Sequence, residues 1–336
     1  MSEDPRDRDY NGRAAVRDAP KVVAHSRKVE TSETIDSTSE DAQKSYRQEL
    51  GSRGSDSKSD SRYRSRSYAG SIKTMLSFFT IFRIDVSERD IASMERNFSL
   101  APVIGFIMGL IAAAVGFIFF ELGLGSLVSA SLVLASLFIV TKFLHFDGLT
   151  DFGDGMVATG DQEKHIRALK DTNIGAGGFG IAFIVTLISF SCLGSAGALI
   201  GLLIWPTEIF MKNAMVAAAT YGEPGDGMAA NQVRNTTQTS LVESTVISVV
   251  LAVIASAIAG LVIWGITGAD TFTSENIGAM AAVLATGLVM SFIVGLLMAQ
   301  VANRTFGRVN GDILGATNEI ARAVILVSSL VVLGLF

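Results

Sequence analysis

The stretch S-L-A-P-V-I-G-F-I-M-G-L-I-A-A-A-V-G-F-I-F-F, residues 99–120, contains no charged side chain. A helix of about 20 apolar residues is long enough to cross the hydrocarbon core of a bilayer, which is about 30 Å thick. Six more apolar stretches follow along the chain, at residues 125–144, 177–195, 197–219, 242–265, 277–301 and 316–336. The sequence therefore predicts an all-α, polytopic integral membrane bundle of about seven transmembrane helices.

Charge is distributed unevenly along the chain. Of its 336 residues, 49% are hydrophobic and 18% are charged. Residues 1–70 hold 14 of the 27 Lys and Arg residues and 13 of the 32 Asp and Glu residues. A segment with this composition cannot bury enough apolar surface to offset the conformational entropy that folding costs. We therefore expect a disordered, charged tail over residues 1–70 and a membrane-embedded domain over residues 71–336, and a water-soluble globular protein is excluded.

Composition also excludes other classes of protein. Cys192 is the single cysteine, which rules out a disulfide framework and a cysteine-based metal cluster. The net charge is −5, and acidic residues nearly equal basic ones in the tail, which argues against nucleic-acid binding.

The loops predict how the chain is oriented in the membrane. Loops after the first, third and fifth stretches contain no Lys or Arg, and short cytoplasmic loops are enriched in these residues. We therefore expect a multi-pass protein of the cell membrane with its N-terminus in the cytoplasm and its C-terminus outside. Residues 71–84 are amphipathic at best, and we expect them to lie at the interface or to be re-entrant. The loops after the second, fourth and sixth stretches carry the basic residues Lys164, Arg167, Lys170, Arg234, Arg304 and Arg308.

Three aspartates lie in the first of these basic loops. Residues 145–155 read H-F-D-G-L-T-D-F-G-D-G, so that Asp147, Asp151 and Asp154 are spaced i, i+4 and i+7. On a helix they share one face, where they repel one another unless a cation lies between them. Carboxylate oxygens at this density suit Mg²⁺ or Mn²⁺, with phosphate oxygens of a substrate completing the coordination. The alternative is a solvated acidic loop with helix-capping aspartates.

A glycine-rich segment follows in the same loop. Residues 170–178 read K-D-T-N-I-G-A-G-G and lead into the third apolar stretch. Backbone N–H groups around Gly175 at a helix start can bind an anion, and Lys170 adds a mobile positive charge. Close helix packing explains the glycines alone about as well. Beside three aspartates, the segment is interpreted as the phosphate half of a metal-phosphate site.

Other ionisable residues lie at the edges of the apolar stretches or within them. Asp312 and Glu319 are seven residues apart and share one face of a helix, with Asn318 beside them. They either act as caps and polar contacts between helices or bind a second metal ion, a ribose or the amide groups of a large substrate. Glu208 and Lys212 are spaced i, i+4, which predicts either an internal ion pair or a buried pair that faces a substrate cavity.

Three polar blocks carry a resemblance to a known family. HFDGLTDFGDG (145–155), LKDTNIGAGGFG (169–180) and VNGDILGATNE (309–319) resemble the signatures H-x-D-G-x-x-D-x-x-D-G, M-K-D-S-x-x-G-x-x-G and T-G-D-x-x-G-A-x-x-E. These are signatures of the cobalamin-5′-phosphate synthase family, also called adenosylcobinamide-GDP ribazoletransferases. Order and spacing agree as well, and the resemblance extends from Phe78 to Phe336.

The resemblance implies a membrane enzyme of late cobalamin biosynthesis. Its expected substrates are adenosylcobinamide-GDP and α-ribazole or its 5′-phosphate, its expected cofactor is Mg²⁺, and GMP is released. The resemblance places the metal on Asp147, Asp151 and Asp154 and covers both candidate proton acceptors, His145 and Asp171, without assigning their roles. The alternatives are a structural, hydrogen-bonding role for His145 and a loop ion pair between Asp171 and Lys170. The further candidates for substrate binding are Lys170, Lys212, Gly175, Asp312, Asn318 and Glu319. A homo-oligomer, or contact with other cobamide-assembly enzymes, stays open.

Two departures from the family pattern concern substrate contacts. The family's Y-x-R-P-x-G run is Y-G-E-P-G-D here, so Glu223 stands where Arg is expected, and Arg234 is the replacement that the sequence suggests. The usual F-x-T-R before the first stretch is F-F-T-I-F-R, which displaces Arg83.

Two rival functions differ in the motifs they need. A CDP-alcohol phosphotransferase also uses aspartates at the membrane surface, with the pattern D-x-x-D-G-x-x-A-R followed by G-x-x-x-D-x-x-x-D, but no Ala-Arg pair follows Asp147 here and the later Asp pair is missing. A cation transporter predicts ionisable groups near the middle of the membrane, whereas most of those in this chain gather at one surface.

Overall fold

The computed structural model describes residues 67–268 and 272–334. The tail predicted over residues 1–70 therefore lies outside the described residues except at its end, where helix α3 (Tyr68–Phe79) begins with Ser67 as its N-cap. The Ser67 hydroxyl accepts a hydrogen bond from Gly70 N at 3.0 Å, which satisfies one of the free N–H groups of the first turn.

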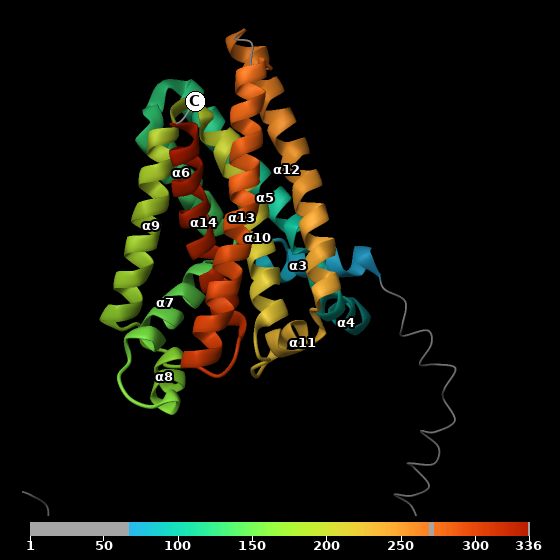
Figure 1. The fold of residues 1–336 in the computed structure, drawn as a ribbon, viewed down its shortest axis with the longest axis vertical. Coiled ribbons are helices and arrows are strands. Elements are labelled where there is room, and N and C mark those ends of the chain that lie inside the picture. Colours follow the sequence, from blue (N-terminus) through green and yellow to red (C-terminus); the bar gives the residue numbers. More distant parts are fainter. Residues whose placement is uncertain (1–66, 269–271, 335–336) are drawn as a thin grey trace, which may run out of the picture. The chain divides into compact units, whose positions relative to one another are not determined.

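The described chain folds into helices, and the prediction of about seven membrane-spanning helices is confirmed. Five of its stretches are long and apolar enough to cross a membrane, and two of these, Phe98–Val140 and Ala176–Tyr221, each contain two helices. The long helices run side by side (Figure 1). They are α5 (Ala101–Phe119), α6 (Gly125–Val140), α9 (Ala176–Ala196), α10 (Ile200–Tyr221), α12 (Gln238–Thr267), α13 (Ser274–Thr305) and α14 (Gly311–Leu333).

Glycine allows the reversal between α5 and α6. The connecting turn η2 (Phe120–Leu124) contains Gly123 with φ 80°, and Gly125 follows with φ 77°. A Cβ atom at either position would meet no neighbour within 4 Å, so the positive φ explains the glycines and crowding does not. A similar turn, η3 (Gly197–Leu199), joins α9 to α10.

Short helices gather at the end of the bundle opposite the end of α14. Figure 1 shows α4, α7, α8 and α11 at its lower end and the last turns of α14 at its upper end. The predicted basic loops therefore share one end of the bundle. These helices are α4 (Glu88–Arg96), α7 (Leu144–Val157), α8 (Gln162–Leu169) and α11 (Met228–Asn235), and the 3-10 turn η1 (Phe98–Leu100) precedes α5.

Helix α3 and the segment after it lie against the end of α6. Ile81 N donates a hydrogen bond to Val140 O at 2.8 Å. Val140 is the last residue of a candidate membrane span. Phe78, Ile81 and Phe82 are each more than a third exposed there. Exposed apolar side chains at the end of a span are typical of the membrane interface, which agrees with the interfacial alternative predicted for residues 71–84.

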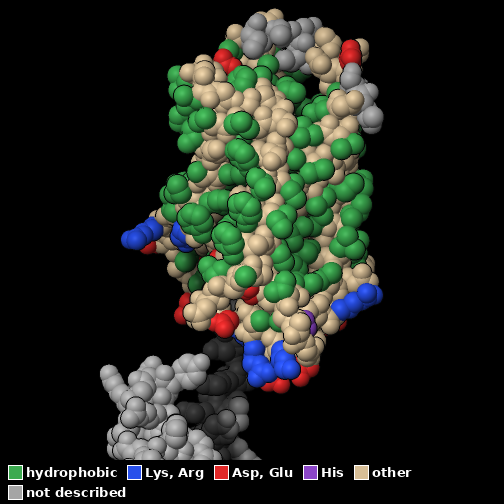
Figure 2. All heavy atoms as spheres, turned by 90° about the vertical axis from the view of Figure 1, so that its left-hand side faces the viewer, with side chains coloured by type: hydrophobic (Ala, Val, Ile, Leu, Met, Phe, Trp, Pro, Cys, Tyr) green, Lys and Arg blue, Asp and Glu red, His purple; other side chains and the backbone are tan. Residues whose placement is uncertain are grey.

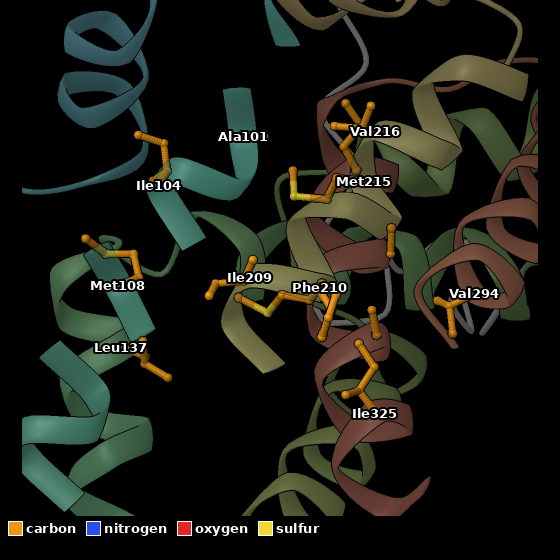
Figure 3. Close-up of a cluster of buried hydrophobic side chains, with 14 of the residues drawn as sticks. Ala101, Ile104, Met108, Leu137, Ile209, Phe210, Met215, Val216, Val294 and Ile325 are labelled. Carbon is orange, nitrogen blue, oxygen red and sulfur yellow. The ribbon is translucent and has the colours of Figure 1, made fainter. Parts of the chain in front are cut away.

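Helix α10 is the centre of the bundle. Its side chains from Leu203 to Ala219 are buried, and Figure 3 shows Ile209, Phe210 and Met215 among the side chains of neighbouring helices. The backbone of α5 approaches α10 closely at Gly105, where an added Cβ atom would lie only 2.3 Å from Glu208 O. Small residues thus allow the close helix packing that the sequence predicts.

The outer surface matches a membrane environment over most of its height. Figure 2 shows hydrophobic side chains covering the upper part of one face, while Lys, Arg, Asp and Glu gather mainly toward its lower end. Val246, Leu261 and Ile266 of α12 are more than half exposed, which is costly in water and favourable in lipid.

Candidate active site

Helix α7 carries the three aspartates of the first polar block, as their spacing predicts. The chain leaves α6 through Lys142 and Phe143, both with positive φ, and α7 begins at Leu144. Asp147 is exposed, while Asp151 and Asp154 are half-buried. Partial burial and then the charges of Asp147, Asp312 and Asp154 raise the pKa of Asp151 to about 7. The carboxylates therefore lie close enough to oppose one another's ionisation.

Asp154 joins the first block to the second. Its two carboxylate oxygens accept hydrogen bonds from Gly175 N and Gly178 N, each at 2.7 Å. These N–H groups belong to the start of α9, so Asp154 satisfies donors that lack a partner within the helix. A Cβ atom at Gly175 would lie 2.4 Å from Asp154 Oδ1, and one at Gly178 only 2.4 Å from Thr150 O. The glycine run thus gives close packing and room for a carboxylate.

The third block packs against the first. A Cβ atom at Gly148 of α7 would lie 2.7 Å from Asp312 O, and one at Gly315 of α14 would lie 3.2 Å from the His145 Cα. Asn310 caps α14 by accepting from Ile313 N at 3.1 Å, and its Nδ2 donates to Asp312 Oδ2 at 2.8 Å. Glycines on both helices therefore bring Asp312 beside the aspartates of α7.

A cavity of about 280 Å³ opens where α3, α7, α11 and α14 meet. Its wall includes His145 and Asp147 of the first block and Asp312 of the third. The polar lining also includes Asp226 of the α10–α11 loop, Gln232 of α11 and Asn310, the N-cap of α14. Gln232 Nε2 is buried and has no hydrogen-bond partner within the described chain, although such groups are normally paired. The apolar part of the wall is formed by Phe78, Phe79, Phe98, Leu144, Ala229, Leu314 and Met215.

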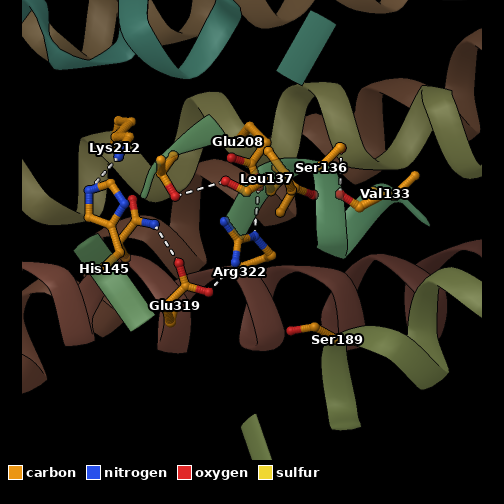
Figure 4. Close-up of polar contacts among 12 residues, drawn as sticks. Val133, Ser136, Leu137, His145, Ser189, Glu208, Lys212, Glu319 and Arg322 are labelled. Carbon is orange, nitrogen blue, oxygen red and sulfur yellow. Dashed lines mark hydrogen bonds and ion pairs between the residues drawn. The ribbon is translucent and has the colours of Figure 1, made fainter. Parts of the chain in front are cut away.

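A network of buried charges lies next to this cavity, inside the bundle. Figure 4 shows Arg322 of α14 between Glu208 of α10 and Glu319. Arg322 Nε lies 2.6 Å from Glu208 Oε1, and Arg322 Nη1 also pairs with Glu319. Asn318 Nδ2 donates to Glu319 Oε1 at 3.1 Å, whereas Asn318 Oδ1 has no partner among the described residues.

Lys212 and His145 connect the network to the cavity. Lys212 Nζ lies 3.1 Å from His145 Nε2 and 5.3 Å from the centre of the Phe79 ring. Burial first, then the positive charges of Lys212 and Arg322, hold the pKa of His145 well below its ordinary value. His145 is therefore a neutral imidazole at physiological pH.

The sequence suggested an ion pair between Glu208 and Lys212, but Glu208 pairs with Arg322 instead. Glu208 and Lys212 lie one turn apart on α10, but Glu208 reaches across to Arg322 on α14 while Lys212 contacts His145. An i, i+4 spacing gives proximity along one helix, and a guanidinium on a facing helix offers better hydrogen-bond geometry to a carboxylate.

Asp171 is not brought to the cavity, and it does not pair with Lys170. Its Oδ1 accepts from the backbone N and the side-chain Nδ2 of Asn173, each at 2.9 Å, and these hydrogen bonds lower the pKa of the Asp171 carboxyl. Lys170 Nζ instead lies 3.6 Å from Asp226 Oδ2.

The carboxylates suit Mg²⁺ only if other ligands complete its shell. Within residues 67–268 and 272–334, no three His, Cys, Asp or Glu side chains are arranged to hold a metal by themselves. Mg²⁺ typically uses one or two carboxylates together with water and substrate phosphates. The carboxylates of Asp147 and Asp151, which lie close enough to repel each other, fit that pattern. Both oxygens of Asp154 already accept hydrogen bonds from backbone N–H groups.

Comparison with known proteins identifies the family of this site. The family model described as cobalamin-5-phosphate synthase matches residues 71–330, which include all three polar blocks. The chain belongs to this family. No solved structure matches the chain.

Curated relatives of this cobalamin-5-phosphate synthase family cover most of the chain. A protein of Methanosarcina barkeri is 27% identical over 289 residues, covering 80% of this chain and 94% of its own length. One of Methanocella arvoryzae is 29% identical over 265 residues, covering 75% and 91%. One of Methanococcoides burtonii is 24% identical over 267 residues, covering 76% and 89%. Each is named adenosylcobinamide-GDP ribazoletransferase.

Sequence reasoning did not single out Arg322, Asp226 and Arg308 as site residues, nor the cavity-lining Gln232 and Asn310. The i, i+3 spacing from Glu319 was a usable signal for Arg322, because a charged residue inside an apolar stretch needs a partner. Asp226 and Arg308 belong to different loops, and a contact between them has no signature in the sequence.

Proposed function

We propose that the chain transfers α-ribazole, or its 5′-phosphate, onto adenosylcobinamide-GDP and releases GMP, with Mg²⁺ as cofactor. One observation supports this proposal above the others: the first and third polar blocks, about 150 residues apart in sequence, line one cavity, and Asp154 joins the second block to the first. The names of the curated relatives, together with the family match over residues 71–330, supply the substrate class.

The reaction exchanges the phosphoanhydride bond of the donor for a phosphodiester bond. A hydroxyl oxygen of α-ribazole forms a bond to the phosphorus nearest the corrinoid side arm, the bridging P–O bond breaks, and GMP leaves with the bond electrons. The hydroxyl proton passes to a base. Mg²⁺ would supply charge neutralisation for the diphosphate and the departing oxygen.

The residues at the cavity and behind its wall have distinct proposed tasks. Asp147 on the cavity wall and Asp151, one turn further along α7, would hold the Mg²⁺, and Asp154 fixes α7 against α9. His145 is the proposed proton acceptor, because it lines the cavity and is neutral, whereas Asp171 lies outside the lining. Asp312 and Asn310 would face the substrates from α14 and its cap.

The buried network would keep His145 in position. Lys212 contacts the ring of His145, and Glu208, Glu319 and Arg322 balance one another's charges behind it. We further propose that this end of the bundle faces the cytoplasm in the cell membrane, because it carries the basic loops.

The test is a product assay on the full chain in liposomes. Adenosylcobinamide-GDP, α-ribazole 5′-phosphate and Mg²⁺ should yield GMP and a corrinoid product that has gained the ribazole, in equal amounts. Release of CMP from a CDP-alcohol would instead indicate the CDP-alcohol phosphotransferase alternative. Cation flux without nucleotide release would indicate the transporter.

A further inference from the structure

Three loops converge at Asp226, which lines the cavity. Asp226 lies in the loop after α10, Lys170 caps the end of α8, and Arg308 lies in the turn after α13. Lys170 Nζ is 3.6 Å from Asp226 Oδ2, and Arg308 Nη1 donates to the same oxygen at 2.5 Å. One carboxylate oxygen therefore faces two cations.

Backbone pairing fixes two of these loops to each other. Val309 N donates to Glu223 O at 2.6 Å, and Gly225 N donates to Val309 O at 3.1 Å, across a parallel bridge between Pro224 and Val309. Arg308 is therefore held beside Glu223 independently of its ion pair. Arg234, which the sequence suggested as a replacement for the missing arginine, is not among the cavity-lining residues and donates to Asn231 instead.

The ion cluster is too exposed to be explained as a stabilising contact. The side chains of Lys170, Arg308 and Asp226 are 51%, 30% and 73% exposed. Exposed pairs contribute about 0–1 kcal/mol, because solvent screens the charges and two long side chains lose freedom. The cluster is also unbalanced, since it holds two positive charges and one negative charge.

The cavity itself needs positive charge. Its described lining includes Asp147, Asp226 and Asp312 but no Lys or Arg. A diphosphate would be repelled by these carboxylates unless cations accompany it. Lys170 and Arg308 carry such charge and are attached to the cavity wall through Asp226.

We propose that Lys170 and Arg308 bind the guanylyl-side phosphate of the donor substrate, and that Asp226 occupies these two cations until the phosphate replaces it. This assignment rests on the proposed function of the cavity. A guanidinium matches the oxygens of a phosphate in a two-point contact, and an ammonium adds a mobile charge. Asp226 is thus a competitor of the substrate for both side chains.

Competition and structural support predict opposite results for Asp226. If Asp226 only pins the loops, Asp226→Asn loosens them and weakens nucleotide binding. If Asp226 competes with phosphate, Asp226→Asn keeps the size of the side chain, frees two cations and tightens nucleotide binding.

The experiment uses the full chain in detergent, with GDP as the binding probe and adenosylcobinamide-GDP as the substrate. Arg308→Met and Lys170→Met should each raise the Kd for GDP and the KM for adenosylcobinamide-GDP about tenfold or more, the scale of a lost hydrogen bond to a charged group. The KM for α-ribazole 5′-phosphate should stay within about twofold. Asp226→Asn should lower the Kd for GDP severalfold.

Matched controls are Arg304→Met and Lys164→Met, which remove exposed basic side chains that, unlike Lys170 and Arg308, form no ion pair with Asp226. Both controls should bind GDP like the wild type. Weaker GDP binding in Asp226→Asn, or unchanged GDP binding in Arg308→Met and Lys170→Met, overturns the assignment of the phosphate site. The proposed function still stands in that case if the wild type transfers ribazole and releases GMP. A wild type that binds GDP with the expected pattern but releases no GMP from adenosylcobinamide-GDP supports the phosphate site and overturns the proposed function.

Discussion

Arg322 and Glu208 form an ion pair inside the helix bundle, with Arg322 Nε 2.6 Å from Glu208 Oε1. Arg322 is 2% exposed and Glu208 is 1% exposed. Because Arg322 also pairs with Glu319, one guanidinium neutralises two buried carboxylates and links α10 to α14. Removing one partner of a buried pair is costly, because the other charge is left without compensation.

Arg322→Met should therefore destabilise the fold strongly. We expect a loss of about 3–5 kcal/mol in the free energy of unfolding, seen as a lower melting temperature in detergent. Arg304→Met removes an exposed arginine from α13 and should leave the melting temperature nearly unchanged. Equal melting temperatures for the two variants would show that the buried pairs do not stabilise the bundle.

Asp154 should be distinguishable from its neighbours by its effect on stability. Its carboxylate accepts N–H groups from Gly175 and Gly178, and an Asn side chain has one oxygen where Asp154 uses two. Asp154→Asn should cost about 1–2 kcal/mol in the free energy of unfolding. Asp161→Asn is the matched control, because Asn caps a helix such as α8 as well as Asp does. A melting curve of Asp154→Asn that overlays the wild type would contradict the capping role.

The raised pKa of Asp151 predicts a pH dependence of stability. Its pKa is about 7 in the fold, against 3.8 ordinarily, so the folded chain holds an extra proton between these values. The corresponding stability is fully present below about pH 4 and is lost as the pH rises through about 7. In EDTA, the melting temperature of the wild type should fall more between pH 5 and pH 8 than that of Asp151→Asn. Parallel pH profiles would show that Asp151 ionises without hindrance from its neighbours.

The two ends of the bundle should lie on opposite sides of the membrane. A reporter fused after Phe336 should be extracytoplasmic, and one inserted near Gln162 should be cytoplasmic, since the α7–α8 region and the last turns of α14 lie at opposite ends of the bundle. Reporter activity on the same side would rule out an odd number of crossings.

Local features of the fold follow from the sequence. An uncharged stretch such as residues 99–120 must form a spanning helix in lipid, because its backbone groups have no other partners. The i, i+4, i+7 spacing of Asp147, Asp151 and Asp154 likewise matches a helix, and α7 is one. These features depend on neighbours along the chain, and sequence records such neighbours directly.

Contacts between distant segments were the part that sequence could not supply. Glu208 pairs with Arg322 on a facing helix and not with Lys212, its neighbour along α10. Lys170 pairs with Asp226 on another loop and not with Asp171, its neighbour in sequence. The glycines before α9 had two open interpretations, and only the packing of α7 against α9 shows that a carboxylate meets Gly175 N.

Catalysis by the carboxylates of α7 is tested most directly by Mg²⁺-dependent GMP release from adenosylcobinamide-GDP in three purified variants. Asp147→Asn and Asp151→Asn keep the shape of the side chain and remove its charge, so turnover should fall by about 10²-fold or more. Raised Mg²⁺ should restore part of it by mass action. Asp161→Asn should stay within about twofold of the wild type. Near-normal turnover with unchanged Mg²⁺ dependence in Asp147→Asn and Asp151→Asn would contradict a catalytic metal site on α7.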